Sequence, residues 1–410
     1  QKAISKYWPV FVLPTLLAFI IGFIWPFIWG IYLSFQRFTT VSKTTFVGIQ
    51  NYISVFQDST FLHAFGFTAA FTVISTVLIN VCAFAIAIVL TRGIKGTNIF
   101  RTVYFMPNLI GGILLGYIWQ ILLNGVLANL QRPLLALDAK AGFVGLVILM
   151  CWQQIGYMMI IYVAGLQSVP GDLIEAAKID GANDREILFK IKIPMVMPSV
   201  TICTFLTLTN SFKLFDQNVA LTAGEPANAS EMLALNIYNT FYGRSGAQWK
   251  GIGQAKAVVF FLIVVVISLI QLHFTRSKEV QQNVETEKNR DVILVVVMVL
   301  LCLLWIYPIV LILLNSLKIE GSFTTSTVFR LPTAETFAGL RNYVYGVTKM
   351  DFLSSMGYSL LITITSVVLI LLCCSMTGWY LTRVNNKLSK FMNLLIVFSM
   401  VVPFQMVMFT

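Results

Sequence analysis

Two groups of polar side chains stand inside long apolar stretches, and their spacing could hold a solute rich in hydroxyl groups. One group lies in "CWQQIGY" (151–157) and the other in "TLTNS" (207–211). Within each group residues recur three or four positions apart, which places them on one face of a helix. Amides and hydroxyls supply the donors and acceptors that sugar hydroxyls need, and an aromatic ring can stack on the C–H face of a sugar. The candidate contact residues are Gln153, Gln154, Tyr157, Thr207, Asn210 and Ser211.

The same six residues have a second interpretation, as hydrogen-bonding links between neighbouring helices. Polar side chains are expensive inside a membrane and are therefore functional candidates by default. Helix bundles in membranes also use Ser, Thr, Asn and Gln to join one helix to the next. The sequence leaves both interpretations open.

The most polar run of its length is "VPGDLIEAAKIDGANDREILFKIKIP" (169–194), between two strongly apolar segments. Asp172 with Glu175, and Asn183 with Glu186, have the spacing of a capping box, which marks the start of a helix. Gly181 separates the two and indicates a turn. The pattern predicts two short helices that carry apolar residues no bilayer requires. These helices could pack on their own bundle or dock into a groove of a soluble partner.

The chain lacks the residue patterns of a nucleotide site, a catalytic triad or a metal centre. The phosphate-binding pattern G-x-x-x-x-G-K-[ST] is absent, and "GIKGTN" (93–98) and "GRSG" (243–246) lack its Lys-Ser/Thr pair. The two histidines, His63 and His273, are near the ends of predicted spans. All six cysteines lie in apolar segments without metal-ligand spacing, so we interpret them as small buried hydrophobes.

The composition requires a solvent other than water. Hydrophobic residues make up 58% of the 410 residues, charged residues 11%, and the mean hydropathy is +0.83. Soluble domains are about 45–50% apolar and about 25% charged. We therefore predict an all-α, polytopic transmembrane bundle. Each apolar run is long enough to cross roughly 30 Å of hydrocarbon, and the predicted spans are 9–35, 63–91, 100–123, 143–167, 196–220, 256–275, 291–316, 354–381 and 391–410.

Basic residues predict the orientation of these spans. With the N-terminus in the cytoplasm, the cytoplasmic segments hold 16 of the 28 Lys and Arg residues, mostly in short loops. This orientation places the 169–194 block in the cytoplasm. It also accounts for the net charge of +11 without nucleic acid as a partner.

The chain repeats itself at an offset of 291 residues. "FVGIQNY" (46–52) matches "FAGLRNY" (337–343), and "LTR" at 90–92 matches "LTR" at 381–383. We expect a first domain over 1–276, a cytoplasmic linker or chain junction over 277–290, and an incomplete second domain over 291–410. Either one fused polypeptide is cut short, or two polypeptides are joined. Because the first residue is Gln, we also expect the native start to be missing.

The 169–194 block resembles the EAA motif of bacterial ABC importer permeases. That motif reads EAA, three residues, Gly, nine residues, Ile, one residue, an aliphatic residue and Pro. "FVGIQNY" (46–52) and "SFKLF…LTAGEP" (211–226) resemble the carbohydrate-uptake branch of maltose, lactose and raffinose permeases, although Glu225 stands where a second Gly is usual. The resemblance covers 7–276, and from about 289 the chain resembles the partner permease of that branch. The residues that match the EAA motif are Glu175, Ala176, Ala177, Gly181, Ile191, Ile193 and Pro194.

The resemblance implies a six-span permease domain, followed by about three spans of a related domain, in the cytoplasmic membrane of a bacterium. In that family the EAA loop forms a coupling helix that docks on an ATP-binding subunit, and ATP drives alternating access to a sugar site. The six candidate solute contacts align with sugar-contacting positions of the maltose-type permease, although most side chains differ. The implied docking residues are Glu175, Ala176, Ala177, Asp180, Gly181 and Pro194.

The resemblance also implies what this chain works with. The implied partners are a second permease subunit forming a heterodimer, two ATP-binding subunits, an extracytoplasmic solute-binding protein, the sugar and membrane lipid. ATP and Mg would bind the partner subunits, so we expect no cofactor in this chain and no enzyme activity of its own. Two alternatives stay open: a permease for another solute such as glycerol phosphate, and a secondary transporter that needs no ATP.

Overall fold

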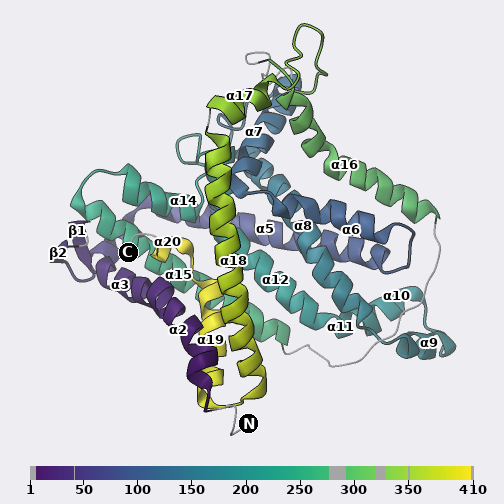
Figure 1. Cartoon of the computed structure of the whole chain (residues 1–410), viewed down its shortest axis with the longest axis horizontal. Coiled ribbons are helices and arrows are strands. Elements are labelled where there is room, and N and C mark those ends of the chain that lie inside the picture. Colours follow the sequence, from purple (N-terminus) through teal and green to yellow (C-terminus); the bar gives the residue numbers. More distant parts are fainter. Residues whose placement is uncertain (1–5, 41, 277–291, 320–327, 350, 408–410) are drawn as a thin grey trace.

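The computed structural model describes residues 6–40, 42–276, 292–319, 328–349 and 351–407. The predicted linker over 277–290 lies outside these ranges. The described chain is almost entirely helical, which confirms the prediction of an all-α fold. Its named strands, β1 (Gln36–Thr40) and β2 (Lys43–Phe46), form a small antiparallel hairpin. Figure 1 shows this hairpin at one end of the molecule and helix α9 (Gly171–Ile179) at the other, and we call these the hairpin end and the α9 end.

Seven helical segments within the described residues are long and apolar enough to cross a membrane, and a bent pair makes an eighth. The first is built from α2 (Trp8–Phe19), the π-helix η1 (Ile20–Ile24) and α3 (Trp25–Ser34). The others are α5 (Ser59–Leu90), α7 (Gly112–Asn129), α8 (Ala139–Gln167), α15 (Ala247–Arg276), α16 (Val292–Ser316) and α18 (Phe352–Arg383). The bent pair joins Asp184–Met195 to α12 (Met197–Phe212) at 68°.

Three predicted spans are interrupted where the backbone cannot continue as a helix. The third splits into α6 (Thr97–Phe105), a 3-10 turn η2 (Met106–Leu109) and α7. The fifth ends at Phe212 and resumes as the short α13 (Asp216–Leu221). The ninth splits at Pro403 into α19 (Lys387–Val401) and α20 (Phe404–Val407), because proline has no N–H and pushes the preceding residue out of the helical region.

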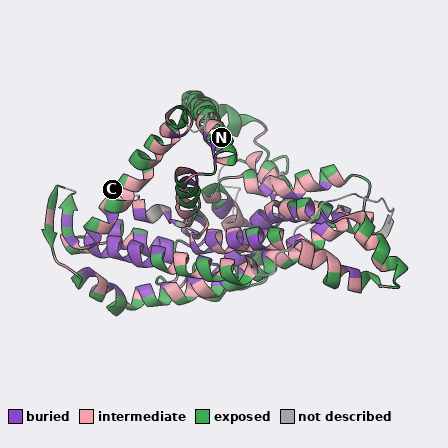
Figure 2. Ribbon diagram, turned by 90° about the horizontal axis from the view of Figure 1, so that it is seen from below, coloured by how far each residue is buried: buried purple, intermediate pink, exposed green. Residues whose placement is uncertain are grey.

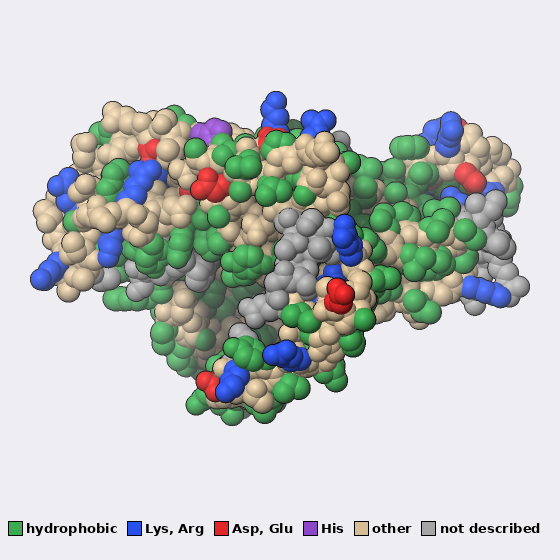
Figure 3. Space-filling view, turned by 90° about the horizontal axis from the view of Figure 1, so that it is seen from above, with side chains coloured by type: hydrophobic (Ala, Val, Ile, Leu, Met, Phe, Trp, Pro, Cys, Tyr) green, Lys and Arg blue, Asp and Glu red, His purple; other side chains and the backbone are tan. Residues whose placement is uncertain are grey.

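Helix α8 is the most buried of the candidate spans and lies at the centre of the bundle. It packs against α5, α6 and α12. A Cβ atom at Gly156 would lie 1.8 Å from the carbonyl oxygen of Tyr104, so α6 touches the α8 backbone where no side chain fits. Figure 2 shows the buried residues gathered in this bundle, and Figure 3 shows hydrophobic side chains over much of one outer face. An apolar exterior of this kind is suited to lipid.

The repeated motif has a structural explanation. Asn51 donates two hydrogen bonds to the carbonyl oxygens of Ser34 and Gln36, each of 2.8 Å, and so closes the C-terminal end of α3. In the second copy, Asn342 donates in the same way to Ser316 and Lys318, at 2.8 and 2.7 Å, at the end of α16. Both copies thus use one asparagine to satisfy carbonyl groups that the helix end leaves free.

A tyrosine completes the clamp in each copy. The Tyr52 and Ser34 hydroxyls are 2.6 Å apart, and the Tyr343 and Ser316 hydroxyls are 2.5 Å apart. We call this arrangement the Asn-Tyr clamp. Its asparagine and tyrosine lie in the first turn of α4 (Gln50–Gln57) in the first copy and of α17 (Arg341–Lys349) in the second.

Helices α18 and α16 of the C-terminal part, residues 292–407, pack on the N-terminal part, as do α19 and α20. Helix α2 lies against α18, where the Thr15 and Thr377 hydroxyls are 2.7 Å apart and the rings of Phe11 and Trp379 stack at 5.1 Å. Helix α16 lies against α6, and the Trp152 indole of α8 donates to the carbonyl oxygen of Trp305 in α16 over 2.9 Å. Most of α18 is exposed and crosses the view of Figure 1 from top to bottom.

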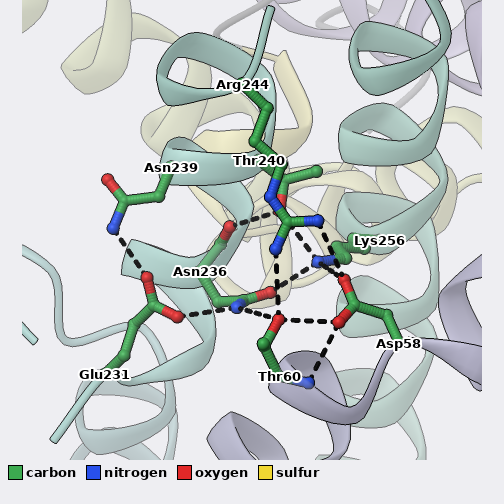
Figure 4. A network of polar contacts seen from close by, with 8 residues as sticks. All are labelled: Asp58, Thr60, Glu231, Asn236, Asn239, Thr240, Arg244 and Lys256. Carbon is green, nitrogen blue, oxygen red and sulfur yellow. Dashed lines mark hydrogen bonds and ion pairs between the residues drawn. The ribbon is translucent and has the colours of Figure 1, made fainter. Parts of the chain in front are cut away.

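A buried cation anchors the hairpin end. Lys256 of α15 is fully buried, and its Nζ donates to Asp58, Asn236 and Thr240, each over 2.8 Å. Figure 4 shows these side chains converging from α5, α15, α14 (Leu233–Tyr238) and the π-helix η4 (Asn239–Gly243). The ammonium ion is fully bonded, and it joins the start of α5 to the α14, η4 and α15 region, which is distant from α5 in sequence.

The acid of this pair is held in its charged form. Burial alone would raise the pKa of Asp58, but hydrogen bonds from Lys256 and Thr60 outweigh it and lower the pKa to about 2. Arg244 adds a longer and more exposed contact to the same carboxylate, at 3.5 Å. Because the pKa of Asp58 is lower in the folded protein than its ordinary value, the charged carboxylate stabilises the fold at pH values above the ordinary Asp pKa. This contribution is lost as the pH falls through about 2.

Replacing Asp58 with Asn should therefore destabilise the purified protein strongly. The substitution leaves the Lys256 ammonium buried and uncompensated, which costs about 3–5 kcal/mol. Unfolding in detergent should show the same loss at pH 5 and pH 8, because the carboxylate is charged at both. Arg244→Gln serves as the control, since this pair is partly exposed and should cost less than about 1 kcal/mol. Equal losses from the two variants would contradict this assignment.

Candidate functional site

A cavity of about 670 Å³ lies between α8, the α12–α13 region, the first span and the end of the C-terminal part. Its polar side chains come from α8, α12 and α13, and its aromatic rings are those of Phe23 and Phe215. The lining residues are Phe23, Met150, Gln154, Asn210, Lys213, Leu214, Phe215, Asp216, Gln217, Val402 and Val407.

Helix α13 is held in place by unusually close packing on α7. A Cβ at Gly116 would lie 2.4 Å from the Cβ of Ala220, so the two helices meet without an intervening side chain. Gln120 of α7 also donates to the carbonyl oxygen of Leu221 over 3.1 Å. This packing fixes the position of Gln217 at the cavity wall.

The two glutamines of α8 have different surroundings. Gln154 lines the cavity, and its Oε1 has no hydrogen-bond partner among the described residues. Gln153 accepts a hydrogen bond from Gln217 over 2.8 Å and donates to the carbonyl oxygen of Ile110 over 3.5 Å. Gln153 therefore connects the broken third span to the cavity wall but does not line the cavity itself.

Thr207 lies in an interhelical hydrogen-bond chain away from the cavity. It is fully buried, donates to the carbonyl oxygen of Cys203 over 2.8 Å and accepts from Asn80 over 2.9 Å. Asn80 in turn accepts from the Tyr162 hydroxyl over 2.6 Å. These contacts correspond to the interpretation of such residues as links between helices.

Of the remaining three candidates, one lines the cavity and two do not. Asn210 lines the cavity. Ser211 is fully buried outside its lining, with a hydroxyl that has no partner among the described residues. Tyr157 is half-buried, with its ring 6.3 Å from that of Phe105, and it also lies outside the lining. The structure thus brings Gln154 and Asn210 together, and solute contact by all six stays a prediction.

Sequence reasoning missed several lining residues. Lys213, Phe215 and Gln217 follow the end of α12, and that break has no proline or glycine to announce it. Phe23 and Val402 come from segments far along the chain, which no local spacing can reveal.

The 169–194 block forms the predicted helix–turn–helix at the α9 end. Gly181 has φ +84°, and a Cβ there would meet nothing within 4 Å, so glycine is favoured by the backbone conformation and not by lack of space. The predicted capping box of Asn183 and Glu186 is confirmed, with reciprocal hydrogen bonds of 3.0 and 3.1 Å. Pro194 lies in the first turn of α11 (Ile193–Met195), just before the 68° bend.

The predicted capping box of Asp172 and Glu175 is wrong. Helix α9 starts at Gly171, its N-cap is Pro170, and no side chain caps it. The extended conformation of Pro170 starts the helix earlier than expected, so Asp172 lies in the first turn, where its negative charge favours the helix N-terminus.

The predicted docking residues lie in the 169–194 block, which we call the α9 element. No residue of α9, which includes Glu175, Ala176 and Ala177, is buried. Asp180 and Gly181 are exposed at the turn that follows. Ile179 is 86% exposed and Phe189 66% exposed, so the element presents large apolar side chains that its own bundle does not cover.

Among the described residues, no group of three or more His, Cys, Asp and Glu side chains could hold a metal ion.

Comparison with known proteins identifies the family of this chain. Residues 83–280 match the family described as "Binding-protein-dependent transport system inner membrane component". The chain is 44% identical, over 67% of its length and 95% of the relative, to a probable starch degradation products transport system permease protein of Thermoanaerobacterium thermosulfurigenes. It is 31% identical, over 67% of its length and 96% of the relative, to an sn-glycerol-3-phosphate transport system permease protein of Brucella abortus biovar 1.

A solved structure has a similar fold. It is a chain of a bacterial ABC transporter involved in the import of the acidic polysaccharide alginate, with a TM-score of 0.57 and 20% identity, matched over 67% of this chain and 98% of that one. The length and apolar character of the helices, together with these relatives, identify a multi-pass protein of the inner membrane. The chain belongs to the family of binding-protein-dependent transport system inner membrane components.

Proposed function

We propose that this chain is the permease component of an ATP-driven importer that moves a sugar, most suitably an oligosaccharide, across the cytoplasmic membrane by alternating access. The observation that carries the proposal is the cavity, where amide groups of α8, α12 and α13 lie beside aromatic rings. Its volume of about 670 Å³ lies within the usual range for small-molecule sites. The relative named for starch degradation products supports the choice of sugar.

The charges of the cavity favour a neutral solute. Lys213 and Asp216 both line it, and their opposite charges balance. An anionic solute such as glycerol phosphate would benefit from Lys213 but would meet the Asp216 carboxylate in the same space. The Lys213 ammonium also already donates to a main-chain carbonyl oxygen, that of Met400, over 2.7 Å.

The exposed α9 element suits the coupling role. ATP and Mg would bind two partner ATP-binding subunits, and Glu175, Ala176, Ala177, Asp180, Gly181 and Pro194 would form or orient the docking surface. Exposed Ile179 and Phe189 support the proposal, because helix-in-groove docking is driven by apolar anchors. A secondary transporter would have no use for such an anchor.

The remaining partners follow from the same proposal. A second permease subunit would complete the pathway as a heterodimer, and an extracytoplasmic solute-binding protein would deliver the sugar. The Asn-Tyr clamp in both copies supports the division into a first permease domain over 1–276 and a second, related one over 291–410.

The proposal is tested by reconstitution. The full-length permease, assembled with its partner subunits and binding protein in proteoliposomes, should hydrolyse ATP faster when malto-oligosaccharides are added and should accumulate them. Glycerol phosphate serves as the comparison solute. Uptake that continues without any ATP-binding subunit would overturn the proposal.

Substitutions in the α9 element should uncouple the transporter. Gly181→Asp forces a side chain onto a left-handed backbone, at about 1–2 kcal/mol, and Ala177→Leu enlarges the proposed contact face. We expect sugar uptake to fall at least about tenfold and ATP-binding subunits to be lost on purification, while the protein still inserts. Gly48→Asp, at a glycine with φ +59° near the hairpin end, is the matched control. Uptake at the wild-type rate from both α9 variants would refute the docking role.

Substitutions in the cavity should weaken solute binding. Gln154→Leu and Asn210→Leu each remove polar groups that line the cavity, so the KM for sugar should rise about 3- to 10-fold, the equivalent of one hydrogen bond. Thr207→Val, outside the cavity, should reduce stability and leave KM unchanged. A KM unaffected by both cavity variants in an assembled complex would remove this cavity as the solute site.

A further inference from the structure

The end of the C-terminal part is seated in the N-terminal part. Val402 is 7% exposed and Met406 fully buried, and both belong to a hydrophobic cluster built mainly from α3, α12 and α15. The ring of Phe398 lies edge-on to those of Phe27 and Phe261, at 5.4 and 5.5 Å. The segment therefore forms part of the N-terminal bundle, although it comes from the opposite end of the chain.

The helix break in this segment leaves main-chain groups that need partners. Helix α19 ends at Val401, and its final carbonyl groups have no partner inside the helix. Two side chains of the N-terminal part bond to carbonyl groups on either side of the break. The Nζ of Lys213 donates to Met400 over 2.7 Å, and the Nε2 of Gln254 donates to Met406 over 3.1 Å.

The same segment forms part of the cavity wall. Val402 and Val407 form part of the cavity lining. Val402 lies between Met400 and Met406, whose carbonyl groups Lys213 and Gln254 bind, and Val407 directly follows Met406. A change in either hydrogen bond would therefore move a wall of the cavity. We call residues 400–407 the wall segment.

We propose that Lys213 and Gln254 act as a latch that positions the wall segment and so controls access to the cavity from the C-terminal part. The proposal rests on the proposed function only in taking the solute to be a sugar. The effect of the latch on access to the cavity does not depend on which solute binds. Gln254 is buried and holds one end, whereas Lys213 holds the other from within the cavity lining.

Lys213 is placed to link a bound solute to the wall segment. An ammonium group has three N–H donors, and one of them bonds to Met400. None of the ion pairs between described residues involves Lys213. A solute that accepts a further hydrogen bond from Lys213 is thereby joined to the wall segment, so solute binding and the position of the wall segment reinforce each other.

The latch predicts the reactivity of a cysteine placed in the wall. In the full-length protein, assembled with its partner subunits and with its native cysteines replaced, Val402→Cys should react slowly with a charged, membrane-impermeant thiol reagent. Adding Lys213→Met should increase the labelling rate about tenfold, the factor expected from loss of a charged hydrogen bond. Gln254→Leu should act in the same direction through an independent contact.

Lys250→Met is the matched control. Lys250 also donates to a main-chain carbonyl oxygen, that of Thr39 over 2.6 Å, but both residues belong to the N-terminal part. This variant should label at the parental rate. Labelling of Lys213→Met and Gln254→Leu at the rate of Lys250→Met would overturn the latch.

Transport kinetics separate the latch from the sugar site. Lys213→Met should raise the KM for sugar about tenfold, and Lys213→Arg should restore most of it, because arginine keeps the charge and the donors. Faster labelling with an unchanged KM would support the latch and refute this cavity as the sugar site. A raised KM without faster labelling would refute the latch and leave Lys213 as a direct solute contact.

Discussion

The structure depends on one constraint, that every main-chain N–H and C=O group inside an apolar bundle must find a partner. Continuous helices such as α5 and α8 meet it internally. Where a span breaks, side chains take over: Gln153 bonds to Ile110 at the break in the third span, and Gln120 bonds to Leu221 at the end of α13. Gln153 also accepts a hydrogen bond from Gln217, which lines the cavity, so the repair of the backbone at one break helps to position the candidate site.

This constraint explains why polar side chains inside the spans serve two purposes. Thr207 belongs to a closed chain of hydrogen bonds, whereas Gln154 is buried with an unpaired oxygen beside a cavity. A buried oxygen without a partner is costly unless a ligand or water supplies a donor. A polar residue in a span is therefore a better candidate for solute binding when its hydrogen-bonding atoms lack protein partners. Its position in the span alone is a weaker indicator.

Much of the architecture follows from the sequence, since apolar runs of twenty residues have few alternatives to a membrane span. The helix–turn–helix of the α9 element was also predictable, because Gly181 and the box of Asn183 and Glu186 are local signals. The break after Phe212 was not predictable, since neither proline nor glycine marks it and α13 packs on α7, a helix distant in sequence. Nor could spacing reveal that Phe23 and Val402 share a cavity wall, because that contact depends on the packing of distant segments.

The Asn-Tyr clamp bears on how these proteins can diversify. The asparagine of the clamp lies 17 residues after its serine in the first copy and 26 residues after it in the second, yet it forms the same contacts. Because the clamp grips main-chain carbonyl groups, the intervening loop can change in length and composition without altering the way the helix ends. The loop is thus a natural insertion point, where new surface can be acquired, or a reporter peptide introduced, while the membrane-embedded framework is conserved.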